Sequence, residues 1–277
     1  MYIFVQLLSH LVQKIPFSCY KLVGKLLSAF NKRYYYRDYR HTMAILQEIF
    51  GKNFHEKVVE WTDYIFLLRA LKQLDFLLFP ALNQKTVPKF VSFDPEEFRF
   101  DKKQGKIFIG YHLGNQNWFP SVFAINGLVL HTLREGRQIW LNKIANPGKI
   151  FRPGKNTREI IKLLRAGELL GLVGDVFTSS KHWVRTEFLG LKVRWPAGFA
   201  RLARLARAEV YVFFSPRWSD GKIYISIRRL PLPDYSDKNF EEKLTKLYVK
   251  ELENFVSKHP EQWLRWRYLK SLTLPKS

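Results

Sequence analysis

The sequence predicts an α/β protein: a three-layer α/β/α sandwich with a mixed, mainly parallel sheet, preceded by N-terminal membrane-associated helices. Three observations predict this fold. Short apolar runs alternate with helical patterns from residue 106 onward. Hydrophobic residues make up 47% of the 277 residues, which is enough for a sizeable core. The first 40 residues join an apolar stretch to a basic, aromatic one. We therefore expect a membrane anchor over 1–40, a helical lead-in over 41–83 and the main domain over 84–277.

The predicted anchor is too short in its apolar part to cross a bilayer. Its charge-free run before Lys14 is about half of the ~20 residues that a spanning helix needs. The uncharged start and the lack of a small-x-small site argue against a cleavable signal peptide. Residues 31–40 alternate tyrosines with Lys and Arg, and both kinds of side chain favour the headgroup layer of anionic lipids. We expect a helix lying in the cytoplasmic leaflet; the alternative is an ordinary core helix with a solvated basic end.

The charge of the chain is strongly positive, with 46 Lys and Arg against 24 Asp and Glu and a formal net charge of +22. Such a chain attracts nucleic acid, acidic lipid headgroups or an acidic carrier protein. Basic and aromatic residues also suit single-stranded nucleic acid, but no recognised nucleic-acid module is present, so we expect no nucleic-acid partner. Cys19 is the single cysteine, and the histidines lack metal-ligand spacing. We expect no disulfide framework and no metal site.

The elements follow from the hydrophobic periodicity. Residues 41–82 are predicted to be helical, and residues 83–104 to be connecting chain. Strands are predicted at 106–111, 126–133, 168–175, 209–216 and 222–230, the last as an edge strand. Helices are predicted at 115–124, 156–167, 197–208 and 240–258.

Two candidate functional residues follow predicted strands. His112 comes directly after the strand at 106–111, and Asp175 ends the strand at 168–175. In open α/β sheets, functional groups gather beyond the carboxyl ends of the strands. Gly114 allows a tight turn that keeps the His112 imidazole at the rim. A histidine there can act as a general base, taking a proton from a hydroxyl that attacks an acyl carbonyl. The alternative, a structural histidine, is the commoner situation.

The segment IGYHLGNQNW resembles the His-x4-acid motif of the late lipid A acyltransferases, the lauroyl and myristoyl transferase group. The wider family also includes phosphatidylinositol mannoside acyltransferases. Further segments resemble the family in the same order along the chain: HTMAILQEIFG, IIKLLRAGELLGLVGD, TEFLGLKVRWPAGFARLARLARAEV and HPEQWLRWRYLK. The resemblance covers nearly the whole chain.

The resemblance implies transfer of a fatty acyl chain from acyl carrier protein, or from acyl-CoA, to a hydroxyl of a lipid A precursor or similar glycolipid. It implies no cofactor and a place on the cytoplasmic face of the cell inner membrane. His112 is then the general base, and Asp175 matches the first acid of a family loop. The family also has a substrate-binding Arg before this loop, for which the candidates are Arg152, Lys155 and Arg158. A glycerophospholipid acyltransferase is the alternative enzyme, although its Phe-Pro-Glu-Gly loop is absent.

The sequence departs from the family at the acid of the motif, where Asn117 stands five residues after His112. The acid accepts the second imidazole N–H and favours the imidazolium that develops, and an Asp-to-Asn change in this role can cost about 10⁴ in rate. Three interpretations remain open. Asp175 takes over the role, or His112 and Asn117 form a working dyad. In the third, the protein has lost transfer activity and binds anionic lipid or carrier protein.

Overall fold

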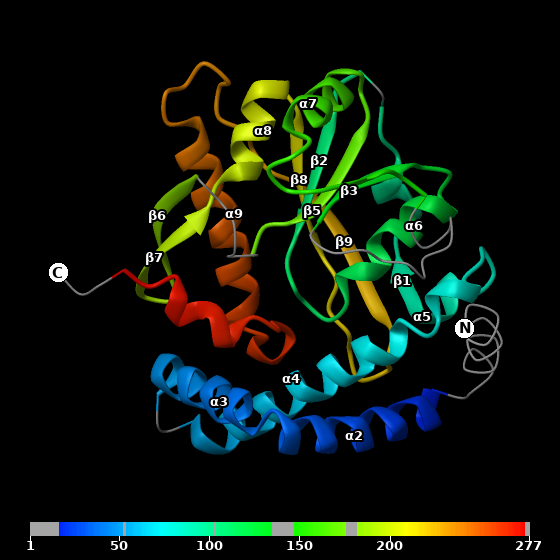
Figure 1. Cartoon of the computed structure of the whole chain (residues 1–277), viewed down its shortest axis with the longest axis vertical. Helices are drawn as coiled ribbons and strands as arrows, with labels where there is room; N and C mark the ends of the chain where they lie inside the picture. Colours follow the sequence, from blue (N-terminus) through cyan, green and yellow to red (C-terminus); the bar gives the residue numbers. More distant parts are fainter. Residues whose placement is uncertain (1–16, 52–53, 102, 135–146, 176–181, 275–277) are drawn as a thin grey trace.

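A seven-stranded sheet forms the centre of the computed structural model, which describes residues 17–51, 54–101, 103–134, 147–175 and 182–274 (Figure 1). In sheet order, the described strands are β1 (Val91–Phe93), β9 (Ile223–Arg229), β8 (Glu209–Phe214), β2 (Lys106–Gly110), β5 (Leu169–Val173), β3 (Leu130–Leu133) and β4 (Ile150–Phe151). Neighbouring strands are parallel except β8 and β9, which are antiparallel. The predicted mixed, mainly parallel α/β sheet is confirmed.

Helices cover both faces of this sheet and one of its ends (Figure 1). The described α-helices are α2 (Phe17–Tyr34), α3 (Tyr36–Phe50), α4 (His55–Asp75), α5 (Val87–Phe90), α6 (Phe119–Ile125), α7 (Thr157–Arg165), α8 (Gly198–Ala206) and α9 (Phe240–Val256). Short 3₁₀ turns lie at η2 (Phe79–Ala81), η3 (Pro95–Phe98), η4 (Gln116–Trp118), η5 (Pro260–Gln262) and η6 (Trp266–Ser271).

The central strand β2 shows why helices are needed on both faces. All five of its residues are buried, as expected for a strand with parallel neighbours and two covered faces. Ile107 and Ile109 join the core that includes residues of α7, α8 and α9. Phe108 points to the other face and packs edge-to-face against Phe123 of α6 at a centroid distance of 4.8 Å. Alternate side chains of β2 thus pack into two separate hydrophobic cores, one on each face of the sheet.

Four elements differ from the sequence-based prediction. The connecting chain at 83–104 contains α5 and β1, and β1 pairs with β9, so β9 is not an edge strand. The strand predicted at 126–133 is regular only from Leu130. A hairpin of β6 (Trp183–Phe188) and β7 (Leu191–Pro196) was not predicted. Leu189 and Gly190 form its two-residue turn with φ of 52° and 76°, the backbone that such hairpins favour.

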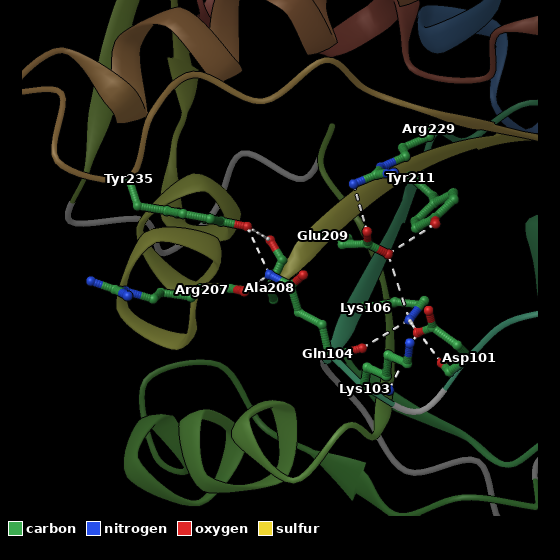
Figure 2. Close-up of polar contacts among 10 residues, drawn as sticks. All are labelled: Asp101, Lys103, Gln104, Lys106, Arg207, Ala208, Glu209, Tyr211, Arg229 and Tyr235. Atoms are coloured by element: carbon green, nitrogen blue, oxygen red, sulfur yellow. Dashed lines mark hydrogen bonds and ion pairs between the residues drawn. The ribbon is translucent and has the colours of Figure 1, made fainter.

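A buried ionic cluster joins the amino ends of β2 and β8 (Figure 2). Lys106 is 2% exposed, and its Nζ lies 2.8 Å from Asp101 Oδ1 and 3.5 Å from Glu209 Oε2. Glu209 also pairs with Arg229 at 2.6 Å, which ties in the end of β9. A buried ammonium is tolerated only when it is paired in this way. The cluster lies at the opposite end of β2 from His112 and holds three strands in register.

The N-terminal helix α2 packs on α4 through small residues. Gly24 lies so close to α4 that a Cβ there would be 2.5 Å from Leu71 Cδ2. The outward face exposes four large apolar residues at four-residue spacing, namely Leu22, Leu26, Phe30 and Tyr34. No described helix combines the length and the apolar character that crossing a bilayer requires. The first 16 residues of the predicted anchor lie outside the described part of the chain.

Candidate active site

The register of the sheet places His112 beside Asp175. Strands β2 and β5 are parallel and pair Gly110 with Val173, so continuing this pairing for two residues brings His112 opposite Asp175. The backbone N–H of Gly174 donates to the Gly110 carbonyl at 3.0 Å, which extends the ladder in this direction. Both side chains therefore lie just beyond the carboxyl ends of adjacent central strands, where α/β folds place functional groups.

The Asp175 carboxylate holds the His112 imidazole from one side. Its Oδ1 lies 2.6 Å from His112 Nδ1, and its Oδ2 accepts the His112 backbone N–H at 2.9 Å. Trp263 Nε1 also donates to Oδ2, at 2.9 Å. Asp175 has no exposed side chain, whereas the His112 side chain is 12% exposed. The carboxylate thus fixes the orientation of the ring, and the Nε2 edge remains available to other partners.

The opposite edge of the ring identifies the tautomer. Arg265 Nη2 lies 2.9 Å from His112 Nε2. Because a guanidinium can only donate, Nε2 accepts this hydrogen bond with its lone pair, and the ring proton sits on Nδ1 facing Asp175. An imidazole with an unprotonated Nε2 and a carboxylate at Nδ1 is the form of a general base.

The electrostatic surroundings keep this base neutral. Burial lowers the pKa of His112 below its ordinary value, and the positive charges of Lys72 and Arg265 act in the same direction, against the opposing effect of Asp175. Burial acts to raise the pKa of Asp175, but the charge and hydrogen bonds of His112 and the Trp263 hydrogen bond outweigh it, so this pKa lies below its usual range. The pair is therefore a neutral imidazole beside a carboxylate at neutral pH.

The segment after α9 closes the site from the C-terminal side. Leu113 and Trp263 form an isolated antiparallel bridge, and the Leu264 N–H donates to the His112 carbonyl at 2.9 Å. Gly114, with φ of +49°, also lies against the segment after β8, where a Cβ would be 2.3 Å from the Ser215 carbonyl oxygen. This backbone pairing places the Trp263 indole next to the Asp175 carboxylate and the Arg265 guanidinium next to Nε2 of the imidazole.

A cavity of about 730 Å³ opens beside His112. Most of the side chains around it are apolar and come from β3, β5, α6, α7 and α8; they include Phe119, Leu133, Ile160, Leu172, Val173, Phe199 and Leu202. Its cationic lining residues are Arg134, Arg201 and Arg265. An apolar cavity of this size with a few polar groups at one point is typical of a small-molecule or lipid site. Across the described residues, no cluster of His, Cys, Asp and Glu is arranged to hold a metal ion.

The other predicted site residues lie apart from the dyad. Asn117 is half-buried in η4 and lines the cavity, and its backbone N–H donates to Asn115 Oδ1 at 3.2 Å. Asp175, not Asn117, holds the Nδ1 edge of the imidazole. Arg152, Lys155 and Arg158 are exposed around the start of α7, where Pro153, Gly154 and Thr157 provide the described cavity wall.

A second buried carboxylate, Asp75, ties the loop after β2 to the N-terminal helices. Its Oδ2 accepts hydrogen bonds from Asn115 Nδ2 at 2.6 Å and from Trp118 Nε1 at 3.0 Å, and it pairs with the guanidinium of Arg217. The hydroxyl of Tyr20 in α2 donates to Oδ1. Asp75 and Arg217 are both almost fully buried, so this ion pair holds α2, α4 and the η4 segment together.

Comparison with known proteins assigns the chain to a protein family. Residues 2–269 match the family described as bacterial lipid A biosynthesis acyltransferase. The chain belongs to this family. No curated protein matches the sequence. Among solved structures, the 1-acyl-sn-glycerophosphate (LPA) acyltransferase PlsC from Thermotoga maritima is similar, with 14% identity, a TM-score of 0.41, and coverage of 85% of this chain and 97% of that one.

In this lipid A acyltransferase family member, the structure places further residues at the candidate site that the sequence did not indicate. Trp263 and Arg265 lie in the segment HPEQWLRWRYLK, which marked the family resemblance but gave no indication of contact with His112. Lys72 lies on α4, and its Nζ donates to Gln116 Oε1 at 2.8 Å next to the site. Burial, together with repulsion from Arg265, lowers the pKa of Lys72 to about 7. Lys72 lies in a helix of mixed apolar and polar residues, and nothing in the neighbouring sequence indicates that it lies near the site.

Proposed function

We propose that this protein is a membrane-associated O-acyltransferase. It transfers a fatty acyl chain from an acyl thioester, on acyl carrier protein or coenzyme A, to a hydroxyl of a lipid A precursor or a similar glycolipid. One observation carries the proposal: an imidazole held by a carboxylate lines a mainly apolar cavity of about 730 Å³. Family membership supports the acyl transfer chemistry. No cofactor is needed for this reaction.

In the proposed mechanism, His112 Nε2 takes the proton of the acceptor hydroxyl as its oxygen attacks the thioester carbonyl carbon. The Asp175 carboxylate stabilises the imidazolium that forms, through the 2.6 Å contact to Nδ1. The tetrahedral intermediate then collapses, the C–S bond breaks, and the imidazolium returns its proton to the thiolate. The products are the ester and the free thiol, and His112 is neutral again.

The positive charge of the protein supports an anionic donor and an anionic acceptor. The formal net charge is +22, and three arginines line the cavity. Acyl carrier protein, coenzyme A and the phosphates of a lipid A precursor are all negatively charged, so the field of the protein increases their encounter rate. We propose that the acceptor is a membrane glycolipid and that no nucleic acid takes part.

The surface of α2 supports attachment to a membrane. Leu22, Leu26, Phe30 and Tyr34 form an exposed apolar stripe along one side of the helix. Lysines and arginines accompany this stripe from Lys21 to Arg40. An amphipathic helix with these features lies in the interface of an anionic leaflet. We propose that α2 attaches the enzyme to the cytoplasmic face of the cell inner membrane.

The test is a transfer assay with the full-length chain in mixed micelles. Radiolabelled acyl carrier protein thioester and acyl-CoA are offered separately, each with a lipid A precursor or with lysophosphatidic acid as acceptor. We expect transfer to the lipid A precursor by the parent protein and a loss of about 10³-fold or more in His112→Ala, in line with removal of a general base. His41→Ala is the matched control, because His41 is an exposed histidine on α3.

The outcomes separate the competing interpretations. Transfer to lysophosphatidic acid alone would show a glycerophospholipid acyltransferase. No transfer by the parent, together with binding of anionic vesicles or carrier protein, would show an impaired homologue. Parent-level transfer by His112→Ala would refute the mechanism. Binding to vesicles that contain phosphatidylglycerol tests the anchor, and Phe30→Asp is expected to weaken it while leaving His112 in place.

A further inference from the structure

The contact between Arg265 and His112 conflicts with base catalysis in the resting structure. Arg265 Nη2 donates to the lone pair of Nε2 at 2.9 Å, and this lone pair must accept the hydroxyl proton. A substrate hydroxyl that reaches Nε2 has to take the place of this N–H. The guanidinium then remains next to the reacting atoms with a hydrogen-bond donor released.

The guanidinium is held beside the imidazole and has further unused donor capacity. The Leu264 N–H donates to the His112 carbonyl at 2.9 Å, and the Leu264 carbonyl accepts from Arg69 of α4 at 3.1 Å. The residue before Arg265 is therefore fixed through both of its backbone polar groups. The Arg265 guanidinium lies 4.9 Å from the Tyr268 ring centroid. Its Nε is buried, with no hydrogen-bond partner among the described residues. Buried donors normally have an acceptor, so the protein does not satisfy all the hydrogen-bond donors of this guanidinium.

We propose that Arg265 is a catalytic residue that stabilises the oxyanion of the tetrahedral intermediate. This inference rests on the proposed acyl transfer. When the acceptor oxygen attacks, the thioester carbonyl bond opens, and its electron pair becomes a negative charge on the carbonyl oxygen. The Arg265 N–H released from Nε2 donates to this oxygen, while Nε2 holds the hydroxyl proton. Collapse restores the carbonyl and expels the thiolate, which takes the proton from Nε2. The lone pair of Nε2 is then free to accept the Arg265 N–H again.

The geometry favours this role over simple anion binding. A group that binds a distant phosphate of the donor need not touch the base, whereas Arg265 contacts the nitrogen that accepts the proton. Donors placed where charge develops in the transition state contribute mainly to kcat, and their removal costs about 10²- to 10³-fold. A binding site for a phosphate would instead affect KM.

Arg265→Gln and Arg265→Lys test the inference, with Arg267→Gln as the control. Arg267 lies two residues away and covers the same Tyr268 ring at 4.5 Å, but it pairs with Asp38 instead of His112. We expect kcat of Arg265→Gln to fall about 10²- to 10³-fold with little change in KM, and Arg265→Lys to retain more activity. We expect the control to keep the parental kcat. A melting curve for each variant checks that it is folded.

The pH profile tests whether the charge of Arg265 acts on His112 in the working enzyme. Among the described residues, the charged groups that act on His112 are Asp175 two residues after β5, Lys72 of α4 and Arg265 itself. Removing the positive charge of Arg265 makes the imidazole easier to protonate. The acidic limb of kcat/KM is therefore expected at higher pH in Arg265→Gln and near its parental position in Arg265→Lys.

The inference and the proposed function can fail separately. If the parent and Arg265→Gln transfer acyl chains at similar kcat, or if only KM rises, Arg265 is not the oxyanion donor, although His112 remains the base. An equal loss in Arg267→Gln would also overturn the inference. If the parent transfers no acyl chain to any acceptor, both proposals are wrong.

Discussion

Replacing Asp175 by Asn removes the charge of the dyad and keeps the size of the side chain. Both carboxylate oxygens accept hydrogen bonds, Oδ1 from His112 Nδ1 and Oδ2 from the His112 N–H and Trp263 Nε1. An amide has one acceptor oxygen and one NH₂ group, so it cannot satisfy all three donors. The consequence depends on how the amide is oriented.

In one orientation, the amide oxygen keeps the two N–H groups and the NH₂ faces Nδ1. The imidazole then accepts at Nδ1 and carries its proton on Nε2, where it cannot act as a base. In the other orientation, the NH₂ faces two buried N–H donors, which costs about 1–3 kcal/mol for each donor that is left unsatisfied. The first orientation is favoured, and with it the inactive tautomer.

The expected result is a kcat reduced by about 10⁴-fold, as for the same change in serine-protease triads. This factor corresponds to about 5 kcal/mol of transition-state stabilisation. The assay is single-turnover acyl transfer to a lipid A precursor, because it separates chemistry from product release. Asn117→Ala is the comparison, since Asn117 lines the cavity without holding Nδ1. A kcat for Asp175→Asn within about tenfold of the parent, or an equal loss in Asn117→Ala, would contradict the assignment of the dyad.

Three further predictions concern the surroundings of the site. The folded protein lowers the pKa of Lys72 to about 7, so folding is less favourable wherever this side chain is protonated in the unfolded state. This destabilisation is complete below pH 7 and disappears as the pH approaches the ordinary lysine pKa. The melting temperature of Lys72→Met should therefore exceed that of the parent by more at about pH 6 than at about pH 10. Asp75→Asn leaves the buried Arg217 without a counter-charge, and urea unfolding should show a loss of about 3–5 kcal/mol. Gly171→Val narrows the cavity where a Cβ lies 2.8 Å from Leu130 Cδ2, and competition between donors of different length should favour the shorter chain by about fourfold per CH₂ excluded from the cavity.

The sequence-based prediction was successful where a local pattern determines the structure. The apolar runs of β2, β5 and β8 are short and bounded by turn residues, and each forms a strand of the central sheet. The helical periods of α7, α8 and α9 likewise appear as helices on the sheet. His112 and Asp175 were recognised as strand-end residues for the same reason, because both follow a buried run directly.

The rest depends on tertiary pairing that no local pattern carries. Strand β1 has three residues, too few to show an alternation of apolar and polar side chains. It forms because its backbone pairs with the outer edge of β9. Strands β6 and β7, joined by a turn at Leu189, pair with each other in a separate two-stranded sheet, outside the alternation of strands and helices that predicted the central sheet. The contact of Arg265 with His112 spans 153 residues and follows from the Leu113–Trp263 bridge. Such a contact could be found only by knowing which segments lie side by side.

Asn117 stands where the resemblance predicts an acid, and this site offers a physical explanation. The imidazole needs one carboxylate at Nδ1, and the chemistry does not require that carboxylate to come from the same turn of the chain. The parallel register of β2 and β5 supplies Asp175 at 2.6 Å, with the His112 N–H and Trp263 fixing its second oxygen. A second carboxylate at residue 117 would not be needed at Nδ1, and it would lie in a cavity wall next to apolar side chains. Asn117→Asp is therefore expected to leave kcat unchanged within about threefold, whereas a large gain would show that Asp175 does not hold the base.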